Sequence, residues 1–277
     1  MARAMVTPRS DNRVLSIVRA PFRMSSSDVP STPAVAPRAL IREPRLAPVV
    51  GTDSHLPAIA ADRLAPDALR ARFAPTLRAF AHATDVDDGE TAWMPEFPGD
   101  GQRLSERPVR RAAVLVPLVR RPGGLAVLLT KRTDHLNDHA GQVSFPGGRT
   151  DPEDVDAVAT ALREAREEVG LAADEVEVIG VLPTYTTVTA YEVTPVIGLL
   201  DPPRALALDP FEVAEVFEVP LAFLMDPANH HRHAVEFQGI ARQFISMPWG
   251  TDASGQSYFV WGATAAMLRN LYRFLAR

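Results

Sequence analysis

Three carboxylates crowd one arc of a single predicted helix near the middle of this chain. Residues 163–171 read REAREEVGL. At about 100° per residue, the side chains of Glu164 and Glu168 nearly eclipse each other, and Glu167 lies about 60° to the other side. Like charges at these spacings repel by roughly 0.2–0.5 kcal/mol per exposed pair. A helix normally avoids this arrangement unless a cation lies over it.

The opposite face of the same helix is apolar. Small and aliphatic side chains recur there at helical spacing: Val158, Ala161, Leu162, Ala165 and Val169. This stripe predicts that the helix packs on a core. Gly170 directly follows it, and a glycine at this position is typical of a left-handed helix cap.

Oxygen ligands on such a helix suit a hard divalent cation, Mg²⁺ or Mn²⁺, whereas zinc would favour histidine or cysteine. Gly147 and Gly148, just upstream, allow bare backbone to approach the ion or a phosphate. An acidic run by itself more often forms a solvated helix face. The sequence FPGG before the helix, Arg163 within the run and Gly170 after it favour a metal site instead.

Residues 147–171 (the Nudix motif) resemble the signature of the Nudix hydrolases: Gly, five residues, Glu, seven residues, then Arg-Glu-aliphatic-x-Glu-Glu-x-Gly-aliphatic. The second half matches at Arg163, Glu164, Glu167, Glu168, Gly170 and Leu171, with Ala165 in place of a larger aliphatic residue. The first half is longer than the signature. Counting from Gly148 places Asp154 at the acidic position. Counting from Gly147 places Glu153 there, so either acid is a candidate partner of the arginine.

A second stretch narrows the resemblance. Residues 128–148, LLTKRTDHLNDHAGQVSFPGG, are similar to the LLTxR…GQxxFPGG stretch of the coenzyme A pyrophosphatase subfamily. The same subfamily shows the lengthened motif with DPxD and TALREAxEEVGL, matched here by residues 151–154 and 160–171. Two positions depart from the pattern, because Thr133 stands where the subfamily has Ser or Ala and Asn137 where it has Arg. The resemblance covers about residues 109–277.

The resemblance implies an α/β fold, namely a Nudix-type α/β/α sandwich with a mixed sheet. It implies that Glu164 and Glu168 hold one metal ion, while Glu167 and the Gly148 carbonyl support it or a second ion. Arg163 would orient a carboxylate of this cluster through a bidentate contact, so the catalytic set is these three glutamates and Arg163. The expected substrate-binding residues are Arg132, Gln142, Phe145 and Gly147. Among these, the arginine is expected to contact the 3′-phosphate of coenzyme A.

The implied function is Mg²⁺- or Mn²⁺-dependent hydrolysis of the pyrophosphate bond of coenzyme A or acyl-CoA. The products would be adenosine 3′,5′-bisphosphate and 4′-phosphopantetheine or its acyl form. The departure at Asn137 leaves open another nucleoside diphosphate, such as ADP-ribose or NADH. A further alternative is a non-catalytic Nudix module that binds a nucleotide. The retained Glu164, Glu167 and Glu168 speak against that alternative.

Composition restricts the partners of the chain. Its 277 residues carry a net charge of −5, which argues against nucleic-acid binding because no basic stripe is available for a phosphate backbone. The absence of cysteine excludes disulfides, thiolate catalysis and cysteine-based zinc sites. The longest apolar run, residues 112–119, is too short for a membrane span. We therefore expect a soluble, cytoplasmic bacterial protein with a small-molecule nucleotide substrate, and a homodimer remains open.

Changes in composition along the chain predict three parts. Residues 1–58 are rich in Pro, Ser, Ala and Arg and are expected to form a disordered tail. Residues 59–108 are expected to hold short helices, broken at Pro75, and a polar linker. Residues 109–277 are expected to form the Nudix hydrolase domain. A chain beginning near Ile59 is accordingly expected to keep full solubility and activity.

Several histidines are candidates for further functional roles. His230, His231 and His233 have the spacing to ligate a transition metal, but a solvated loop is the favoured interpretation. His135 and His139 lie four residues apart beside the expected substrate entry. They are candidates for a phosphate contact or an acid–base role, and otherwise brace the loop.

Acidic and aromatic residues after the Nudix motif give further candidates. Nudix enzymes often recruit one more carboxylate from outside the motif, and Glu212 or Glu215 could supply it. The large aromatic residues Trp249, Tyr258 and Trp261 could stack on adenine. Burial in the core is the favoured role for such side chains.

Overall fold

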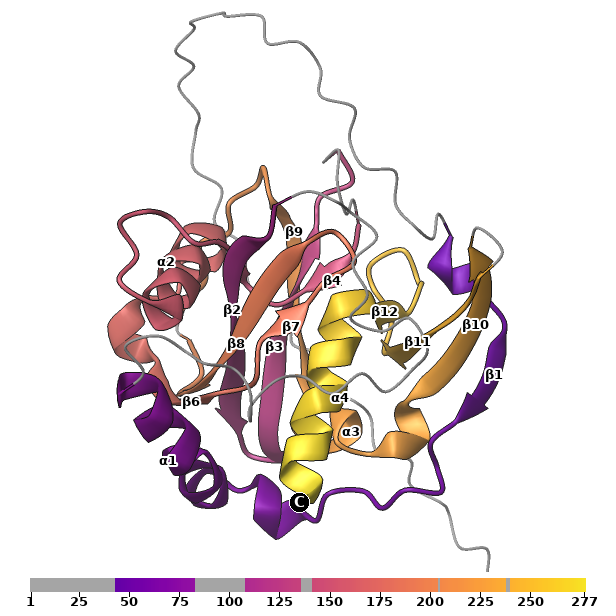
Figure 1. Cartoon of the computed structure of the whole chain (residues 1–277), viewed down its shortest axis with the longest axis horizontal. Coiled ribbons are helices and arrows are strands. Elements are labelled where there is room, and N and C mark those ends of the chain that lie inside the picture. The colour runs from indigo at the N-terminus through magenta and orange to yellow at the C-terminus, as the bar shows by residue number, and fades with distance from the viewer. Residues whose placement is uncertain (1–42, 83–107, 136–140, 204, 238–239) are drawn as a thin grey trace, which may run out of the picture.

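Two β-sheets and four α-helices make up the described part of the chain. The computed structural model describes residues 43–82, 108–135, 141–203, 205–237 and 240–277 (Figure 1). The eight-stranded sheet contains β2 (Arg110–Arg121), β3 (Gly124–Arg132), β4 (Val143–Ser144), β5 (Gly147–Arg149), β6 (Glu177–Val181), β7 (Tyr185–Thr186), β8 (Tyr191–Leu200) and β9 (Val213–Pro220). The four-stranded sheet contains β1 (Val49–Thr52), β10 (His231–Phe237), β11 (Ile240–Trp249) and β12 (Tyr258–Trp261).

The helices surround these sheets. They are α1 (Pro66–His82), α2 (Ala157–Val169), α3 (Leu221–Leu224) and α4 (Gly262–Ala276). Short 3₁₀ turns lie at η1 (Pro44–Leu46), η2 (Ala61–Leu64), η3 (Ala173–Glu175) and η4 (Pro227–Asn229). The Nudix motif spans β5, the loop after it and α2.

The segment before α2 is held between two strands that separate. β2 and β3 form a hairpin and pair at residues 118–121 and 124–127. Farther from the turn, β2 pairs with β5 and β3 pairs with β4. The Leu115 N–H also donates to the Pro146 carbonyl at 2.8 Å. Because β4 and β5 take up the space between β2 and β3, residues 143–149 are fixed by backbone hydrogen bonds to both strands.

Alternate residues of the central strands face two different cores. In β2, Ala113, Leu115 and Val119 lie in the core that includes α2. Val116 and Leu118 lie in the core that includes α4. This period of two is expected of a sheet covered on both faces. Since β2 runs parallel to β8 and antiparallel to β3, the sheet is mixed. The predicted α/β/α sandwich is confirmed, and Figure 1 shows α2 and α4 on its two sides.

The sequence of α2 explains both of its ends. Asp156 caps the first turn, where its Oδ1 accepts a hydrogen bond from the Ala159 N–H at 2.8 Å. Gly170 ends the helix at φ 72°, the left-handed conformation expected of a cap glycine. Ala161 and Ala165 are fully buried against the sheet. The predicted apolar stripe is therefore the packed face of α2.

The N-terminal part of the described chain differs from the prediction. Residues 49–52 fall in the expected disordered tail, yet they form β1, an edge strand antiparallel to β10. α1 continues through Pro75 and is not broken there. The fully buried Phe73 belongs to the core, and this packing offsets the backbone hydrogen bond that proline cannot donate. Residues 1–42 lie outside the described residues.

Asp53, directly after β1, joins this strand to the interior. Its carboxylate is fully buried and pairs with Arg232 of β10 and with Arg269 of α4, the second at 3.1 Å. Three segments distant in sequence therefore meet at one charge. Removal of all residues before Ile59 would delete β1 and this carboxylate. The structure thus argues against the expectation that such a chain keeps full solubility and activity.

Two members of the histidine cluster, His230 and His233, are buried and His231 is half-buried at the start of β10, so the favoured solvated loop is wrong. His230 is fully buried, and its Nε2 lies 2.8 Å from the Leu224 carbonyl oxygen. His233 is also buried, with Nδ1 2.9 Å from the Ala47 carbonyl oxygen and Nε2 2.8 Å from the Ser246 hydroxyl. Each ring is held by hydrogen bonds to another segment, which local sequence does not reveal. Within the part of the chain that the structure describes, there is no group of three or more His, Cys, Asp or Glu side chains that could hold a metal ion.

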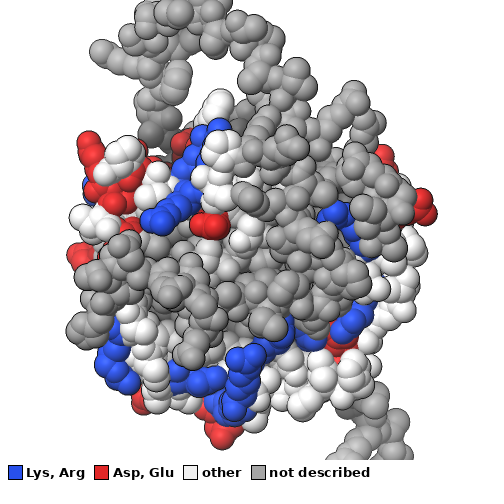
Figure 2. All heavy atoms as spheres, viewed as in Figure 1, with Lys and Arg blue, Asp and Glu red and all other residues white. Residues whose placement is uncertain are grey.

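Figure 2 shows basic and acidic groups interspersed on the described part of one face. Among the described residues, no helix has both the length and the apolar character needed to cross a membrane.

Replacement of Asp53 by Ala removes the carboxylate that Arg232 and Arg269 share. Removing one partner from a buried ion pair typically costs 3–5 kcal/mol, so we expect the free energy of unfolding to fall by about 3 kcal/mol. Urea denaturation of the full chain measures this change. Asp62→Ala removes an exposed acid of η2 and should change the free energy by less than about 0.5 kcal/mol. Equal effects of the two substitutions would show that Asp53 does not anchor β1.

Candidate active site

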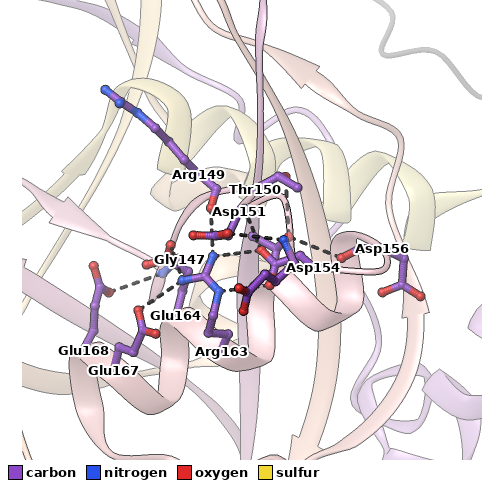
Figure 3. Close-up of polar contacts among 12 residues, drawn as sticks. Gly147, Arg149, Thr150, Asp151, Asp154, Asp156, Arg163, Glu164, Glu167 and Glu168 are labelled. Atoms are coloured by element: carbon purple, nitrogen blue, oxygen red, sulfur yellow. Dashed lines mark hydrogen bonds and ion pairs between the residues drawn. The ribbon is translucent and has the colours of Figure 1, made fainter.

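The guanidinium of Arg163 lies at the centre of the Nudix motif (Figure 3). It makes a bidentate contact with Asp154, at 3.0 Å from Nε to Oδ1 and 2.8 Å from Nη2 to Oδ2. Nη1 donates to Glu164 at 3.0 Å and to Glu167 at 3.1 Å. Nη2 also donates to the Arg149 carbonyl at 2.9 Å. One side chain therefore ties α2 to the loop that precedes it.

The sequence left two acids as partners of Arg163, and the structure selects Asp154. The Asp154 Oδ2 also accepts from the Asp151 N–H at 2.8 Å, which closes a turn that takes up the extra length of the motif. Glu153 is exposed, and its N–H donates to Asp151 Oδ1 at 3.2 Å. The hydrogen-bonded Arg163 holds the pKa of Asp154 well below its usual range, so the pair stays ionised at neutral pH.

Glu168 is the most deeply buried acid of the motif, with 4% of its surface exposed. Its Oε2 accepts from the Gly147 N–H at 3.3 Å, and its Oε1 lies 3.6 Å from Nη1 of Arg132. Burial raises the pKa of Glu168 to about 8, and the Arg132 charge opposes part of that rise. Burial also raises the pKa of Glu164, against the effect of Arg163. Both acids therefore lie where a cation would stabilise their charged forms.

The two glycines before α2 allow the backbone to approach its neighbours closely. A Cβ at Gly147 would lie 2.5 Å from the Ala113 carbonyl oxygen. A Cβ at Gly148 would lie 2.5 Å from the carboxylate of Glu164. No larger residue fits at either position without displacing β2 or the acid. The backbone of Gly148 therefore lies against the carboxylate of Glu164.

Arg132 of β3 lies between an acid of the motif and an acid outside it. Its Nη1 is 3.6 Å from Glu168 Oε1, and its Nη2 is 3.4 Å from Glu212 Oε2. The Thr133 N–H donates to the Glu212 carbonyl at 3.0 Å, which fixes residue 212 beside the end of β3. Burial is the largest cause of the raised pKa values of Glu168 and Glu164, and the negative charge of Glu212 raises both pKa values further. Of the outside acids considered, Glu212 is the one that reaches the site.

Two other acids after the motif, the candidate Glu215 and also Glu218, have different partners. Glu215 accepts a hydrogen bond from the Tyr258 hydroxyl. Glu218 forms an ion pair with Arg121 at 2.6 Å. The aromatic residues weighed for adenine stacking pack against other rings: Tyr258 on Phe217, Trp249 on Phe223 and Trp261 on Phe244. These contacts agree with the expectation that the three aromatic residues pack within the protein, in preference to stacking on adenine.

One expected substrate-binding side chain is misassigned. Phe145 is 2% exposed and belongs to the core that includes α4, so its ring is not available to a substrate. Gln142 stays beside the site, because its carbonyl accepts from the Arg132 N–H at 2.9 Å. His135 lies at the edge of the described loop, with its ring centroid 5.0 Å from that of Phe211. Two further candidates lie outside the described residues, Asn137 and His139.

The donor set of the motif fits a hard divalent cation by its chemistry. It consists of the carboxylates of Glu164, Glu167 and Glu168 and the backbone carbonyl of Gly148, all oxygen. Burial penalises the charges of the first and third of these acids, which a cation would offset. As the side chains stand, the described residues form no group of three or more His, Cys, Asp or Glu that could hold a metal ion. Arginines neutralise these acids in the arrangement shown, so the fit rests on donor chemistry and burial.

Comparison with known proteins identifies the family. The NUDIX domain model matches residues 109–236. The chain is 46% identical over 162 residues to the protein named Uncharacterized Nudix hydrolase NudL of Escherichia coli (strain K12), a match that covers 58% of this chain and 81% of that protein. NudL of Shigella boydii serotype 4 (strain Sb227) shows the same identity and coverage. The chain therefore belongs to the Nudix hydrolase family.

Solved structures include relatives at lower similarity. An Ap4A hydrolase binary complex of C. elegans is 22% identical, covers 43% of this chain and 86% of its own, and has a TM-score of 0.36. The family assignment rests on the NudL relatives, because this TM-score is low. Nudix hydrolases act on phosphoric anhydride bonds and generally require divalent metal cations.

The buried Glu168 makes the stability of the chain depend on pH. Its pKa is about 8 in the folded chain against an ordinary value of 4.5, so the folded state binds this proton more tightly than the unfolded state. The resulting stabilisation is fully present below about pH 4.5 and is lost as the pH rises through about 8. In EDTA, we therefore expect Glu168→Gln to be more stable than the wild type at about pH 8, with the difference shrinking towards about pH 5.

Thermal unfolding across this pH range measures the effect. Glu153→Gln, which changes an exposed acid of the same motif, is the matched control and should follow the wild type. If Glu168→Gln and the control show the same pH dependence, burial does not hold the proton on Glu168.

Proposed function

We propose that this chain hydrolyses the pyrophosphate bond of coenzyme A or acyl-CoA with Mg²⁺ or Mn²⁺ as its cation. The products are adenosine 3′,5′-bisphosphate and 4′-phosphopantetheine or its acyl form. The observation that carries the proposal is the Arg163 network, which holds Glu167 and also Glu164, whose carboxylate lies against Gly148. We propose the cytoplasm as its location.

The acids of α2 would hold the cation. Glu164 and Glu168 would coordinate one ion, and Glu167 with the Gly148 carbonyl would support it or a second ion. A bound divalent cation neutralises the pyrophosphate, lowers the pKa of a water molecule and stabilises the leaving phosphate. The fork of Arg163 orients its carboxylates in a way that a lysine cannot reproduce, since lysine offers a single ammonium group.

Glu212 supplies the remaining carboxylate of the proposed site. It comes from the segment before β9, opposite α2, and its Oε2 is 3.4 Å from Arg132. A carboxylate that is not one of the proposed metal ligands on α2 suits the role of general base. It keeps an oxygen available to accept the proton of the attacking water. The contact with Arg132 fixes its orientation.

The substrate assignment draws on residues 128–148, whose similarity to the coenzyme A pyrophosphatases comes from the sequence. Thr133, one of the two departures, is accommodated in the structure, because its hydroxyl donates to the Phe211 carbonyl at 2.7 Å. The second departure, Asn137, lies outside the described residues. Arg132 faces Glu168 and Glu212, so its expected contact with the 3′-phosphate competes with these acids.

Two other functions would use the same residues differently. Hydrolysis of ADP-ribose or NADH needs the same acids but no group that recognises a 3′-phosphate. A non-catalytic nucleotide-binding module would not need the buried and costly carboxylate of Glu168. The first alternative is therefore the nearer rival.

A panel of nucleotides separates these functions. We expect the full chain with Mn²⁺ to hydrolyse coenzyme A and acetyl-CoA faster than ADP-ribose or NADH, as measured by chromatography of the products. Adenosine 3′,5′-bisphosphate should appear with each coenzyme A substrate. Faster turnover of ADP-ribose would overturn the substrate while keeping the reaction class, and no turnover of any member would favour the binding module.

Glu168→Gln is the control that assigns the activity to the motif. Loss of a catalytic electrostatic contact typically lowers the rate by about 100-fold or more. Glu153→Gln, in the same motif but outside the Arg163 network, should retain the wild-type rate. Near wild-type turnover by Glu168→Gln would remove Glu168 from the mechanism.

A further inference from the structure

Three arginines line one open pocket beside the Nudix motif. The pocket has a volume of about 380 Å³, within the range of small-ligand sites. It is lined by Arg110, Arg111, Arg149, Thr150, Asp151 and Pro152 (the arginine pocket). The pocket forms where the start of β2 meets β5 and the loop after it, since Arg149 pairs with Ala112 and the Thr150 N–H donates to the Arg111 carbonyl at 3.1 Å.

The charges of the arginine pocket are not neutralised by neighbouring acids. Within the described residues, neither Arg110, Arg111 nor Arg149 has a carboxylate oxygen within 4.0 Å. Glu192 lies opposite Arg111 in the register of β2 and β8 without forming such an ion pair. Asp151 also lines the pocket, and its Oδ1 accepts from the Glu153 N–H at 3.2 Å. A chain with a net charge of −5 thus concentrates three positive charges at one place.

Arg149 is held in a defined direction. Its Nε donates to the Tyr191 hydroxyl at 2.9 Å, and its guanidinium carbon lies 5.6 Å from the centre of that ring. Figure 3 shows this side chain extending away from Glu164, Glu167 and Glu168. Among the described residues, the other guanidinium nitrogens of Arg149 have no hydrogen-bond acceptor. A fork of this kind suits a phosphate, which accepts two parallel hydrogen bonds.

The arginine pocket adjoins the acids without sharing their side chains. Arg149 directly follows Gly148, whose backbone lies against the carboxylate of Glu164. Its own carbonyl accepts from Arg163 at 2.9 Å. A group bound in the pocket would therefore lie close to a pyrophosphate bound at the acids. In coenzyme A, one ribose separates the pyrophosphate from the 3′-phosphate.

We propose that the arginine pocket binds a phosphomonoester of the nucleotide substrate, the 3′-phosphate in the case of coenzyme A. The proposal deepens the function given above and rests on it for the identity of the nucleotide. It replaces the expected role of Arg132, because that guanidinium already faces Glu168 and Glu212. The pocket then supplies the specificity for substrates that carry a phosphate beyond the bond that is cleaved.

Binding of two products tests the pocket without any hydrolysis. Adenosine 3′,5′-bisphosphate and adenosine 5′-monophosphate differ in the 3′-phosphate alone, so calorimetric titration of each into the full chain isolates that group. We expect the wild type to bind the bisphosphate at least about tenfold more tightly, since a charge-assisted contact of about 1.5 kcal/mol has that effect. The preference should weaken as salt screens the exposed arginines.

Substitutions then locate the preference. Arg111→Ala combined with Arg149→Ala should bring the two affinities together, while Arg120→Ala, at the other end of β2, should leave the preference unchanged. The melting temperature of each variant confirms that it is folded. A combined variant that keeps the wild-type preference overturns the proposal, and so does equal binding of both nucleotides by the wild type. Loss of the preference in Arg132→Ala alone would return the 3′-phosphate to Arg132.

These outcomes are separate from those of the proposed function. A chain that prefers the bisphosphate and loses this preference with the arginine pocket supports the site even if coenzyme A is not hydrolysed. A chain that hydrolyses coenzyme A and its 3′-dephospho form equally, with equal binding of the two products, keeps the reaction and refutes the pocket.

Discussion

The site depends on the guanidinium of Arg163. It binds Asp154 with two nitrogens and also reaches Glu164, Glu167 and the Arg149 carbonyl. These groups come from the end of β5, from the loop at residues 150–156 and from α2, so one planar cation fixes the distance between β5 and α2. The lengthened first half of the motif is compatible with this network because Asp154 closes its own turn. A lysine could neutralise one acid, but it could not hold both edges of the loop.

The sheet and the motif together set the electrostatics of the site. β4 and β5 fill the space between β2 and β3, which brings the Gly147 N–H to 3.3 Å from Glu168. The same packing buries Glu168, raising its pKa to about 8. A buried carboxylate of this kind costs stability when it is charged and gains interaction energy when a cation binds. If the motif acids hold a cation as proposed, stability and metal affinity are linked through Glu168.

Local patterns predicted the parts of the fold that local sequence determines. The apolar stripe of α2 and its Gly170 cap follow from the spacing of the residues along the helix. The stacking of Glu164 and Glu168 on one arc also follows from helix geometry alone. Spacing left the partner of Arg163 open between two acids, because the loop insertion could be counted from either glycine. Only the folded turn shows which carboxylate reaches the guanidinium.

The errors concern contacts between distant segments. β1 has four residues without alternation, and it becomes a strand only through pairing with β10 and the ion pairs of Asp53. His230 and His233 are buried because carbonyl and hydroxyl partners from other segments satisfy their rings. Phe145 lies in a sequence that suggests a substrate contact, yet the sheet turns its ring into the core. The sequence alone makes Glu212 a candidate for the additional carboxylate. Only the folded structure shows that its side chain lies close to Arg132.

Whether Glu164 and Glu168 hold the cation can be measured directly by electron paramagnetic resonance of Mn²⁺ titrated into the full chain. The wild type should remove free Mn²⁺ from solution, and the double variant Glu164→Gln/Glu168→Gln should lose that binding. The double variant Glu153→Gln/Glu236→Gln removes the same charge from two exposed acids and should bind as the wild type does. Equal Mn²⁺ binding by the two double variants would contradict the assignment of the motif acids as the metal site.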